Sequence, residues 1–298
     1  MRGDGDGWVV GSHGVRRWGK HGAAGLLLRS PDASGAPTVL LQHRAQWCHH
    51  GDTWGLPGGA RDSHETEIHA ALREAEEETG ISRKHVRVRA RVATGEDVPG
   101  WEYTTVVADI ARQMPAVGNS ESIALAWVPE SQVKGYRLHP GLAETWPKLE
   151  LTQIRLIVDS ANVVGARANG WWRDRAGATL AFAQELQHAF PVTCPLPGGG
   201  FGWVNGAELV VEGQARGAIE KFDDTGVVTM FAADGIGDDH IVERAKRSAD
   251  GSAADGSATN RVTTVVVSAD RGLKERLPGD VRVLGPKTIL AWLAASGS

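Results

Sequence analysis

Alternation of apolar and polar positions divides the first half of the chain into short strands and two helices. Apolar or β-branched runs of strand length, separated by Gly- and Asp-rich turns, predict strands. These runs are Trp8–Val10, Gly22–Leu28, Thr38–His43, Val86–Thr94, Tyr103–Asp109 and Ala124–Val128. Helical composition is found over Thr66–Thr79 and Pro140–Leu149. The first half is therefore expected to mix strands and helices in one domain.

Strands and helices alternate more regularly in the second half. The predicted order is a strand ending at Asp159, a helix over Arg173–Phe190, strands at 207–213 and 226–232, a helix beginning at Asp238, a β-branched strand ending at Asp270, and a closing helix. This alternation predicts a mostly parallel sheet with helices on both faces. The Gly-, Ala- and Ser-rich stretch Ala249–Thr259 predicts a low-complexity loop.

The chain length of 298 residues suits two domains. We expect a boundary near Thr152, which gives domains at residues 1–151 and 152–298. A hydrophobic content of 41% and a charged content of 23% allow each half to bury a core. The net charge of −4 gives no reason for general attraction to nucleic acid or anionic lipid, so any nucleic-acid contact must be local.

The two cysteines, Cys48 and Cys194, lie far apart and show no metal-ligand spacing, which argues against a disulfide framework and a zinc site. Reduced thiols and the absence of a basic-then-apolar N-terminal pattern favour the cytoplasm. No apolar run approaches the roughly 18 residues of a membrane span. The sequence predicts a cytoplasmic protein without membrane contact and leaves its oligomeric state open.

The densest chemistry lies in Gly59–Ile81, with the sequence GARDSHETEIHAALREAEEETGI. On its predicted helix Glu74, Glu77 and Glu78 share one face, because residues three and four apart are neighbours. Like charges at this spacing destabilise a helix. Either the face is simply solvated, or it binds a hard divalent cation such as Mg²⁺ or Mn²⁺ through carboxylate oxygens.

The same segment matches the pattern G-x5-E-x7-R-E-U-x-E-E-x-G-U, where U is apolar, and so resembles the Nudix box. Nudix hydrolases use this loop-helix-loop segment to bind metal and to cleave a nucleoside diphosphate linked to another group. The resemblance favours metal binding and implies an α/β/α sandwich with a mixed sheet. The other fixed positions of the motif are Gly59, Glu65, Arg73 and Gly80.

The resemblance also assigns roles to residues. It implies that Glu74, Glu77 and Glu78 bind the catalytic metal. Arg73 would orient a box glutamate through a charge-assisted hydrogen bond, and Glu65 would support the loop or a metal-bound water.

Two further roles lie outside the box. The preceding turn, WGLPGG, is similar to the approach segment of the family and implies the Gly58 carbonyl as a metal ligand. The general base outside the box varies among members. Glu121 is the first candidate, followed by Glu96 and Glu102, and an ordinary surface carboxylate is the alternative for each.

The nucleotide substrate is left open among nucleoside triphosphates, oxidised nucleotides, nucleotide sugars such as ADP-ribose, and dinucleotides. Aromatic side chains between the box and residue 150 could stack a base, with core packing as the alternative. These are Trp101, Tyr103, Trp127 and Trp146.

Acidic residues in the second half follow predicted strands or begin helices, and the carboxyl edge of an open α/β sheet is where ligands bind. The segments VDSANVV, GDDHI and VVVSADRGL resemble parts of the NYN/PIN-like nucleases, which cut RNA with Mg²⁺ or Mn²⁺. The likeness implies a PIN-like domain with Asp159, Asp239 and Asp270 as ligands. Asp238 and Asn162 would support them. Helix caps and a turn are the alternative interpretation.

An aromatic and basic cluster follows the first strand of this half, and it would either stack single-stranded RNA or make an interdomain contact. Its members are Arg167, Trp171, Trp172, Arg173 and Arg175. The leading hypothesis is a Mg²⁺-dependent Nudix-type pyrophosphohydrolase fused to a metal-dependent RNase. The alternatives are an active hydrolase with an inert C-terminal interaction domain, and a nucleotide-sensing module, which the retained glutamates disfavour.

Overall fold

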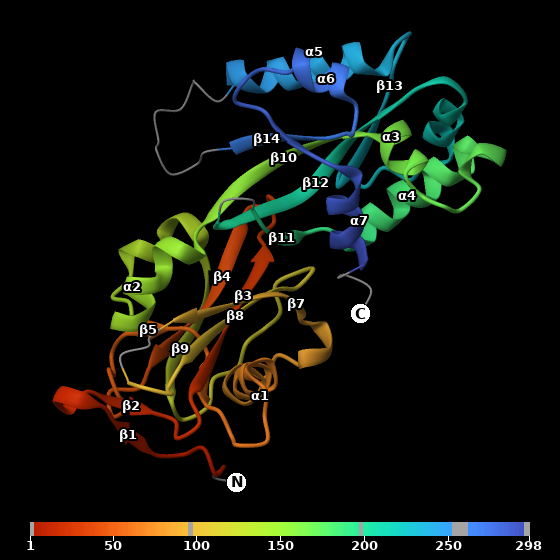
Figure 1. The fold of residues 1–298 in the computed structure, drawn as a ribbon. Coiled ribbons are helices and arrows are strands. Elements are labelled where there is room, and N and C mark those ends of the chain that lie inside the picture. The colour runs from red at the N-terminus through yellow and green to blue at the C-terminus, as the bar shows by residue number, and fades with distance from the viewer. Residues whose placement is uncertain (1–2, 95–97, 197–198, 252–261, 295–298) are drawn as a thin grey trace. The chain divides into compact units, whose positions relative to one another are not determined.

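The computed structural model in Figure 1 describes residues 3–94, 98–196, 199–251 and 262–294. By compactness the chain divides into two units. One comprises Met1–Leu151 with Pro195–Phe201, and the other Thr152–Cys194 with Gly202–Ser298. The first unit thus includes a short segment from the second half of the sequence. Domains at 1–151 and 152–298 stay a prediction about independent folding.

The first unit is built on a seven-stranded mixed sheet. Its strands are β3 (Ala23–Pro31), β4 (Pro37–Arg44), β5 (Trp54–Gly55), β6 (Gly58–Ala60), β7 (Arg87–Thr94), β8 (Tyr103–Asp109) and β9 (Ser122–Pro129). The order is β5-β4-β3-β8-β7, with β6 paired to β3 and β9 paired to β4. Central β3 runs parallel to β8 and antiparallel to β4 and β6, so the sheet is mixed.

Strand β3 buries both of its faces. Leu26 and Leu28 pack with helix α1 (Glu67–Thr79), whereas Leu27 packs on the opposite face with helix α2 (Pro140–Leu149). Because side chains alternate along a strand, the continuous apolar run GAAGLLL supplies two cores. The unit is the expected α/β/α sandwich with a mixed sheet (Figure 1).

Smaller elements complete the first unit. Strands β1 (Trp8–Val10) and β2 (Arg16–Trp18) pair antiparallel. The 3-10 turns are η1 (Ser12–Gly14), η2 (Arg83–His85) and η3 (Glu130–Gly135). The base-stacking candidates pack in the fold: Trp101 and Trp146 are buried, while Tyr103 and Trp127 are half-buried. These contacts favour a core role for all four.

The second unit contains a mostly parallel sheet. Its strands are β10 (Leu151–Asp159), β11 (Val192–Pro195), β12 (Phe201–Val211), β13 (Val228–Ala232), β14 (Val262–Val267) and β15 (Arg282–Leu284). The order is β11-β12-β10-β14-β15, with β13 paired to β12. Parallel pairing joins β10 to β14, β14 to β15, and β12 to β13, which agrees with the sequence-based fold class.

Helices lie on both sides of this sheet. They are α3 (Ser160–Gly165), α4 (Arg175–Ala189), α5 (Gly237–Gly251), α6 (Arg271–Arg276) and α7 (Pro286–Ala294), with 3-10 segments η4 (Trp171–Arg173) and η5 (Gly213–Lys221). Figure 1 shows α5 and α6 on one side, and α3, α4 and α7 on the other. The loop predicted over Ala249–Thr259 is helical up to Gly251, and residues 252–261 lie outside the described residues. No described helix is both long and apolar enough to span a bilayer.

The strand order places a topological switch point beside β10. The chain passes from β10 to β12 and β13 on one side, and then crosses to β14 and β15 on the other side. Open α/β sheets bind ligands at the carboxyl ends of strands at such a point, because the connecting loops diverge there and leave a crevice. Asp159 ends β10, and Asp270 lies just beyond β14.

Candidate active site

Helix α1 is fixed at both ends by the residues that flank it. The Thr66 hydroxyl accepts a hydrogen bond from the His69 N–H at 3.2 Å, which caps the amino end. Gly80 follows the helix with a φ of 70° and donates its N–H to the Glu76 carbonyl. Only glycine adopts this left-handed conformation without strain, so Gly80 ends the helix at a set place.

The three glutamates on one face of α1 differ in exposure. Glu78 is only 3% exposed, and its Oε2 accepts the Gly58 N–H at 2.8 Å. The side chain of Glu74 is 19% exposed and that of Glu77 is 60% exposed. The carboxylates therefore form a row that leads from the core beside the glycine turn out to solvent.

Arg73 joins the loop to this row of carboxylates. Its Nε and Nη2 donate to the two oxygens of Glu65 at 2.7 and 2.8 Å, and its Nη1 donates to Glu74 at 2.9 Å. Nη2 also reaches the Ala60 carbonyl at 3.1 Å. The hydrogen bond from Arg73 lowers the pKa of Glu65 and, in return, raises the pKa of Arg73. Both side chains are thus held charged and in place.

Burial disfavours the ionised form of the two inner carboxylates. It raises the pKa of Glu78 to about 7, against the smaller opposing effect of the Gly58 N–H. Burial also raises the pKa of Glu74, and the charges of Glu77 and Glu121 act in the same direction. A cation close to these oxygens would stabilise their charged forms.

The glycine turn passes so close to its neighbours that a side chain in it would force them to move. A Cβ on Gly59 would lie 2.6 Å from a Glu74 carboxylate oxygen, and one on Gly58 would lie 2.4 Å from the Ala24 carbonyl oxygen. The result is a compact set of oxygen donors in which one cation, Arg73, is shared among Glu65, Glu74 and Glu77. These residues fit a hard divalent ion such as Mg²⁺ or Mn²⁺.

The candidates for a base outside the box occupy different places. Glu121 lies just before β9, and its carbonyl accepts the Ala45 N–H at 2.8 Å. Its charge contributes to the raised pKa of Glu74, which places it near the glutamate row. Glu102 instead accepts a hydrogen bond from Thr104 at 3.0 Å. Glu96 lies outside the described residues.

Two residues near the glutamates were missed in the sequence. Gln42 is fully buried, lowers the pKa of Glu78 and donates to the Ser122 hydroxyl at 2.9 Å. The charge of Arg44 lowers the pKa of Glu78. Polar residues two apart at the end of the apolar strand TVLLQHR share one face of β4, and this alternation is the signal that could have revealed them.

The second unit brings acidic residues together around a cavity of about 250 Å³ at the carboxyl ends of its strands. The residues that line it are Asp159, Ala161, Asn162, Val210, Glu212, Gly237, Asp238, Ile241 and Asp270. Three of the predicted aspartates and the predicted asparagine therefore meet, although they are spread over more than a hundred positions of the sequence.

Hydrogen bonds fix the acidic residues on either side of the switch point. Asp159 accepts from the Asn162 N–H at 3.0 Å and from the Ser268 hydroxyl at 2.9 Å. Asn162 in turn accepts the Ala269 N–H, and Asp270 caps α6 by accepting the Leu273 N–H. Burial raises the pKa of Asp159, and the charges of Asp238 and Glu212 raise it further.

Asp238 and Asp239 point to different surroundings. Burial and the nearby charge of Asp270 raise the pKa of Asp238, which lines the cavity. Asp239 is exposed and pairs with Arg276. Successive residues of a helix point about 100° apart, so α5 can turn only one of the two into the cavity. Glu212, which sequence analysis missed, lines the cavity and accepts the Gly237 N–H at 2.9 Å.

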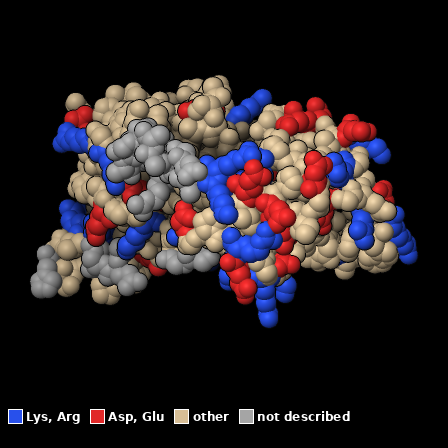
Figure 2. All heavy atoms as spheres, turned by 90° about the horizontal axis from the view of Figure 1, so that it is seen from above, with Lys and Arg blue, Asp and Glu red and all other residues tan. Residues whose placement is uncertain are grey.

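The predicted aromatic and basic cluster is only partly available to a ligand. Arg167 pairs with Glu185 at 2.7 Å, while Trp172 is 59% exposed. Arg175 lies over the Trp171 ring at 5.4 Å. Figure 2 shows acidic and basic side chains intermingled on the face it displays, without a broad basic field. Two of the three arginines of the cluster, Arg167 and Arg175, thus have partners within the protein.

Comparison with known proteins identifies the first unit. Residues 19–149 match the family model of the NUDIX domain. A Mycobacterium tuberculosis protein named "Putative 8-oxo-dGTP diphosphatase 3" is 56% identical over 153 residues, which are 50% of this chain and 70% of that protein. The chain therefore belongs to the Nudix hydrolase family, whose members generally use divalent cations such as Mg²⁺ or Mn²⁺.

Two other relatives cover a similar share of the chain. The "Nucleoside triphosphate pyrophosphatase/Nudix hydrolase fusion protein" of Bifidobacterium longum is 38% identical over 149 residues, 48% of this chain and 30% of that protein. A crystal structure of RenU, a Nudix hydrolase from M. smegmatis, shares 54% identity, covers 48% of this chain and 91% of that one, and has a TM-score of 0.47.

The buried Glu78 carboxyl predicts an unusual pH dependence of stability in the metal-free protein. Its pKa is about 7 in the folded state and 4.5 when exposed, so the folded state binds the proton more tightly. The resulting stability is present below about pH 4.5 and is lost as pH rises to about 7. We expect Glu78→Gln to remove this loss, so that at about pH 8 its free energy of unfolding exceeds that of wild type by about 3 kcal/mol.

Urea unfolding in a chelator, followed by tryptophan fluorescence across this pH range, measures the effect. Glu144→Gln is the control, because Glu144 is an exposed residue of α2 outside the glutamate row and its removal should leave the pH profile unchanged. Identical pH profiles for wild type and Glu78→Gln would show that the carboxyl is not held in a low-dielectric site.

Proposed function

We propose that the first unit hydrolyses a phosphoanhydride bond of a nucleoside triphosphate with Mg²⁺ or Mn²⁺, and that 8-oxo-dGTP is a substrate. The observation that carries the reaction type is the row of Glu74, Glu77 and Glu78 beside the glycine turn. The choice of nucleotide is supported by the 56% identity to the M. tuberculosis protein named for 8-oxo-dGTP. Nucleotide sugars and dinucleotides are the alternatives.

Different residues would bind the metal and hold the metal-binding carboxylates in position. Glu74, Glu77, Glu78 and the Gly58 carbonyl would hold the metal, which neutralises phosphate oxygens and lowers the pKa of a bound water. Arg73 holds the Glu74 carboxylate in position, since it is itself fixed by two bonds to Glu65.

Two residues outside the box complete the proposed mechanism. Glu121 is proposed to take the proton of the attacking water, because its charge acts on Glu74 and its side chain is exposed. Arg44 supplies positive charge close to Glu78, where it would face the negative phosphates of a substrate. The active site thus combines metal-binding carboxylates with one cation of the chain.

Removing one metal-binding carboxylate should abolish hydrolysis while the fold stays intact. We expect Glu77→Gln and Glu78→Gln to lower kcat by at least about 100-fold, since a catalytic metal contributes several kcal/mol to the transition state. Release of phosphate and diphosphate with Mg²⁺ measures the effect. Glu76→Gln is the matched control on the same helix, because Glu76 pairs with Arg83 on the surface. Wild-type turnover by either site variant would refute the assignment.

The identity of the nucleotide can be tested separately with the wild-type protein. We expect kcat/KM for 8-oxo-dGTP to exceed that for dGTP by about tenfold or more, if polar groups of the site recognise the oxidised base. ADP-ribose and a dinucleoside polyphosphate complete the panel. A preference for either of these would reject the proposed substrate and leave the proposed reaction type standing.

We also propose that the cavity of the second unit binds Mg²⁺ or Mn²⁺ and cleaves single-stranded RNA. Asp159, Glu212, Asp238 and Asp270 supply oxygen donors around one space at the switch point. Helix capping explains Asp159 and Asp270 individually, but it does not require that four carboxylates surround one cavity. The likeness to NYN/PIN-like nucleases remains part of this proposal, and an inert interaction domain is its alternative.

A cleavage assay separates these two interpretations of the second unit. We expect the full chain to cut single-stranded RNA in Mn²⁺, and Asp270→Asn to lose at least about 100-fold of that rate by disturbing the metal site. Asp280→Asn, an exposed aspartate outside the cavity, should keep it. Absence of cleavage by wild type, or equal cleavage by Asp270→Asn, would reject the nuclease.

A cytoplasmic location stays a prediction. Both cysteines, Cys48 and Cys194, carry free thiols in the structure, which suits a reducing compartment. Detection of the tagged protein by fractionation of the host cells would test it.

A further inference from the structure

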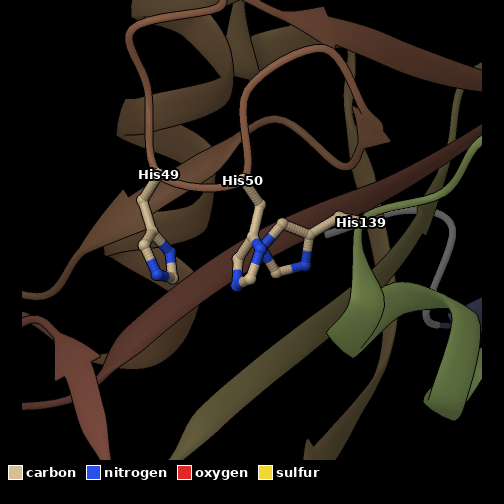
Figure 3. A group of neighbouring side chains, drawn as sticks. All are labelled: His49, His50 and His139. Atoms are coloured by element: carbon tan, nitrogen blue, oxygen red, sulfur yellow. The ribbon is translucent and has the colours of Figure 1, made fainter.

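Three histidines from two separate segments meet at the surface of the first unit. His49 and His50 belong to the loop between β4 and β5, and His139 precedes α2. Figure 3 shows the rings of His49 and His50 descending from the same loop, with the His139 ring beside that of His50. Ring centroids are 4.0 Å apart for His49 and His50, and 4.8 Å for His50 and His139. One nitrogen from each ring lies within 4.8 Å of the others.

The backbone holds these rings together. His50 has a φ of 54°, a left-handed conformation that is uncommon for a residue other than glycine. The Thr53 hydroxyl donates to the His50 carbonyl at 2.5 Å, and the His139 N–H donates to the Trp54 carbonyl at 2.7 Å. His49 also meets the edge of Trp8 at a centroid distance of 5.1 Å. The cluster is thus anchored at both segments by the fold.

The surroundings of all three imidazoles favour the neutral form, which is the form that binds metal. Burial lowers the pKa of His49 and of His50, and it lowers the pKa of His139 to about 4. Neutral imidazole has a free nitrogen lone pair for a cation, whereas imidazolium has none. The neighbouring His43 ring has other partners: its Nε2 lies 3.1 Å from Asp52, and the ring stacks on Trp54.

Ligand chemistry decides which ion suits the cluster. Nitrogen donors prefer Zn²⁺ and similar first-row ions over Mg²⁺, which requires oxygen. The positive charges of Arg44, Arg17 and Arg16 lie close enough to lower histidine pKa values. These positive charges would weaken the binding of any cation, so binding depends on strong coordination bonds and not on electrostatic attraction. These conditions favour a metal ion of intermediate hardness with high affinity for imidazole.

We propose that His49, His50 and His139 bind one Zn²⁺ ion, or a first-row ion of the same ligand preference, and leave a fourth position for water. Zinc lies about 2.0–2.1 Å from imidazole nitrogen, so ligand nitrogens in a tetrahedral site are about 3.4 Å apart. The rings must therefore close from their present separation of up to 4.8 Å. Side-chain rotation in an exposed loop can supply this movement.

Metal binding would compete with the cap of α2. The Nδ1 of His139 accepts the Gly141 N–H at 3.2 Å, which caps the amino end of that helix. If Nδ1 binds the metal, its hydrogen bond from the Gly141 N–H is lost. If Nε2 binds the metal, Nδ1 must carry the proton, and this N–H then faces the Gly141 N–H. Asparagine can make the same cap without an imidazole. Substituting His139 by Asn therefore separates the metal ligand from the helix cap.

The test is zinc binding by the full chain after removal of metal with a chelator. Equilibrium dialysis against Zn²⁺ gives the stoichiometry, and Co²⁺ absorption reports the ligand geometry at the histidines. At a free Zn²⁺ concentration that just fills the wild-type site, we expect wild type to bind more zinc, by up to one equivalent, than His139→Asn or His50→Ala. Losing one of three ligands should lower the affinity for that equivalent by at least about tenfold. His188→Ala, which removes an exposed histidine of α4, should bind as wild type does.

Circular dichroism of His139→Asn checks that α2 remains folded. Excess Mg²⁺ should leave the extra equivalent of Zn²⁺ bound, because it does not compete for nitrogen ligands. Equal stoichiometry and affinity in wild type and both cluster variants would overturn the proposal. Absence of zinc binding by wild type, or an equal loss in His188→Ala, would overturn it as well.

Discussion

The hydrogen bond between the Gly58 N–H and Glu78 connects the sheet of the first unit to its chemistry. Strand β6 carries Gly58 and pairs with β3, so the turn is fixed by the central strand of the sheet. The bond then fixes Glu78 in a buried place where its charge is poorly solvated. The rest of the glutamate row follows from helical geometry, because Glu74 is one turn away. A sheet register thus determines where a metal ion would be held.

The second unit also brings carboxylates together, but by a different arrangement of its chain. Its carboxylates do not share a helix face but come from the ends of β10 and β12, the start of α5 and the segment after β14. Backbone N–H groups and the Ser268 hydroxyl satisfy some of their oxygens, which lowers the cost of gathering like charges. Strand order brings these residues together, so this site depends on topology where the first depends on local sequence.

Prediction from sequence succeeded where the relevant geometry is local. A helix expected over Thr66–Thr79 is found over Glu67–Thr79, and the i, i+3 and i+4 spacing correctly placed three glutamates on one face. Near-continuous apolar runs correctly indicated strands buried on both sides. Strand ends also located the acidic edge of the second unit, because parallel strands present their carboxyl ends together.

Features that depend on angles or distant contacts were less accessible. The choice between Asp238 and Asp239 depends on how far α5 is rotated about its axis, which hydrophobic pattern leaves undetermined. Glu212 becomes visible only when β12 is known to lie beside β10. The histidine cluster joins residues about ninety positions apart through a loop of unusual backbone conformation. Such contacts arise from tertiary packing, so no periodic pattern in the sequence predicts them.

The short segment Pro195–Phe201 affects where the chain can be cut to obtain the Nudix domain as a separate fragment. Phe201 packs in the core of the first unit with Leu27 and Trp146, although it is encoded far beyond Leu151. A fragment that stops at Leu151 would lack this ring, and losing a buried phenylalanine typically costs about 3–5 kcal/mol. Excising the Nudix half with one stop codon would thus leave a hole in its core. The core of the first unit is thus completed by a residue from the second half of the sequence.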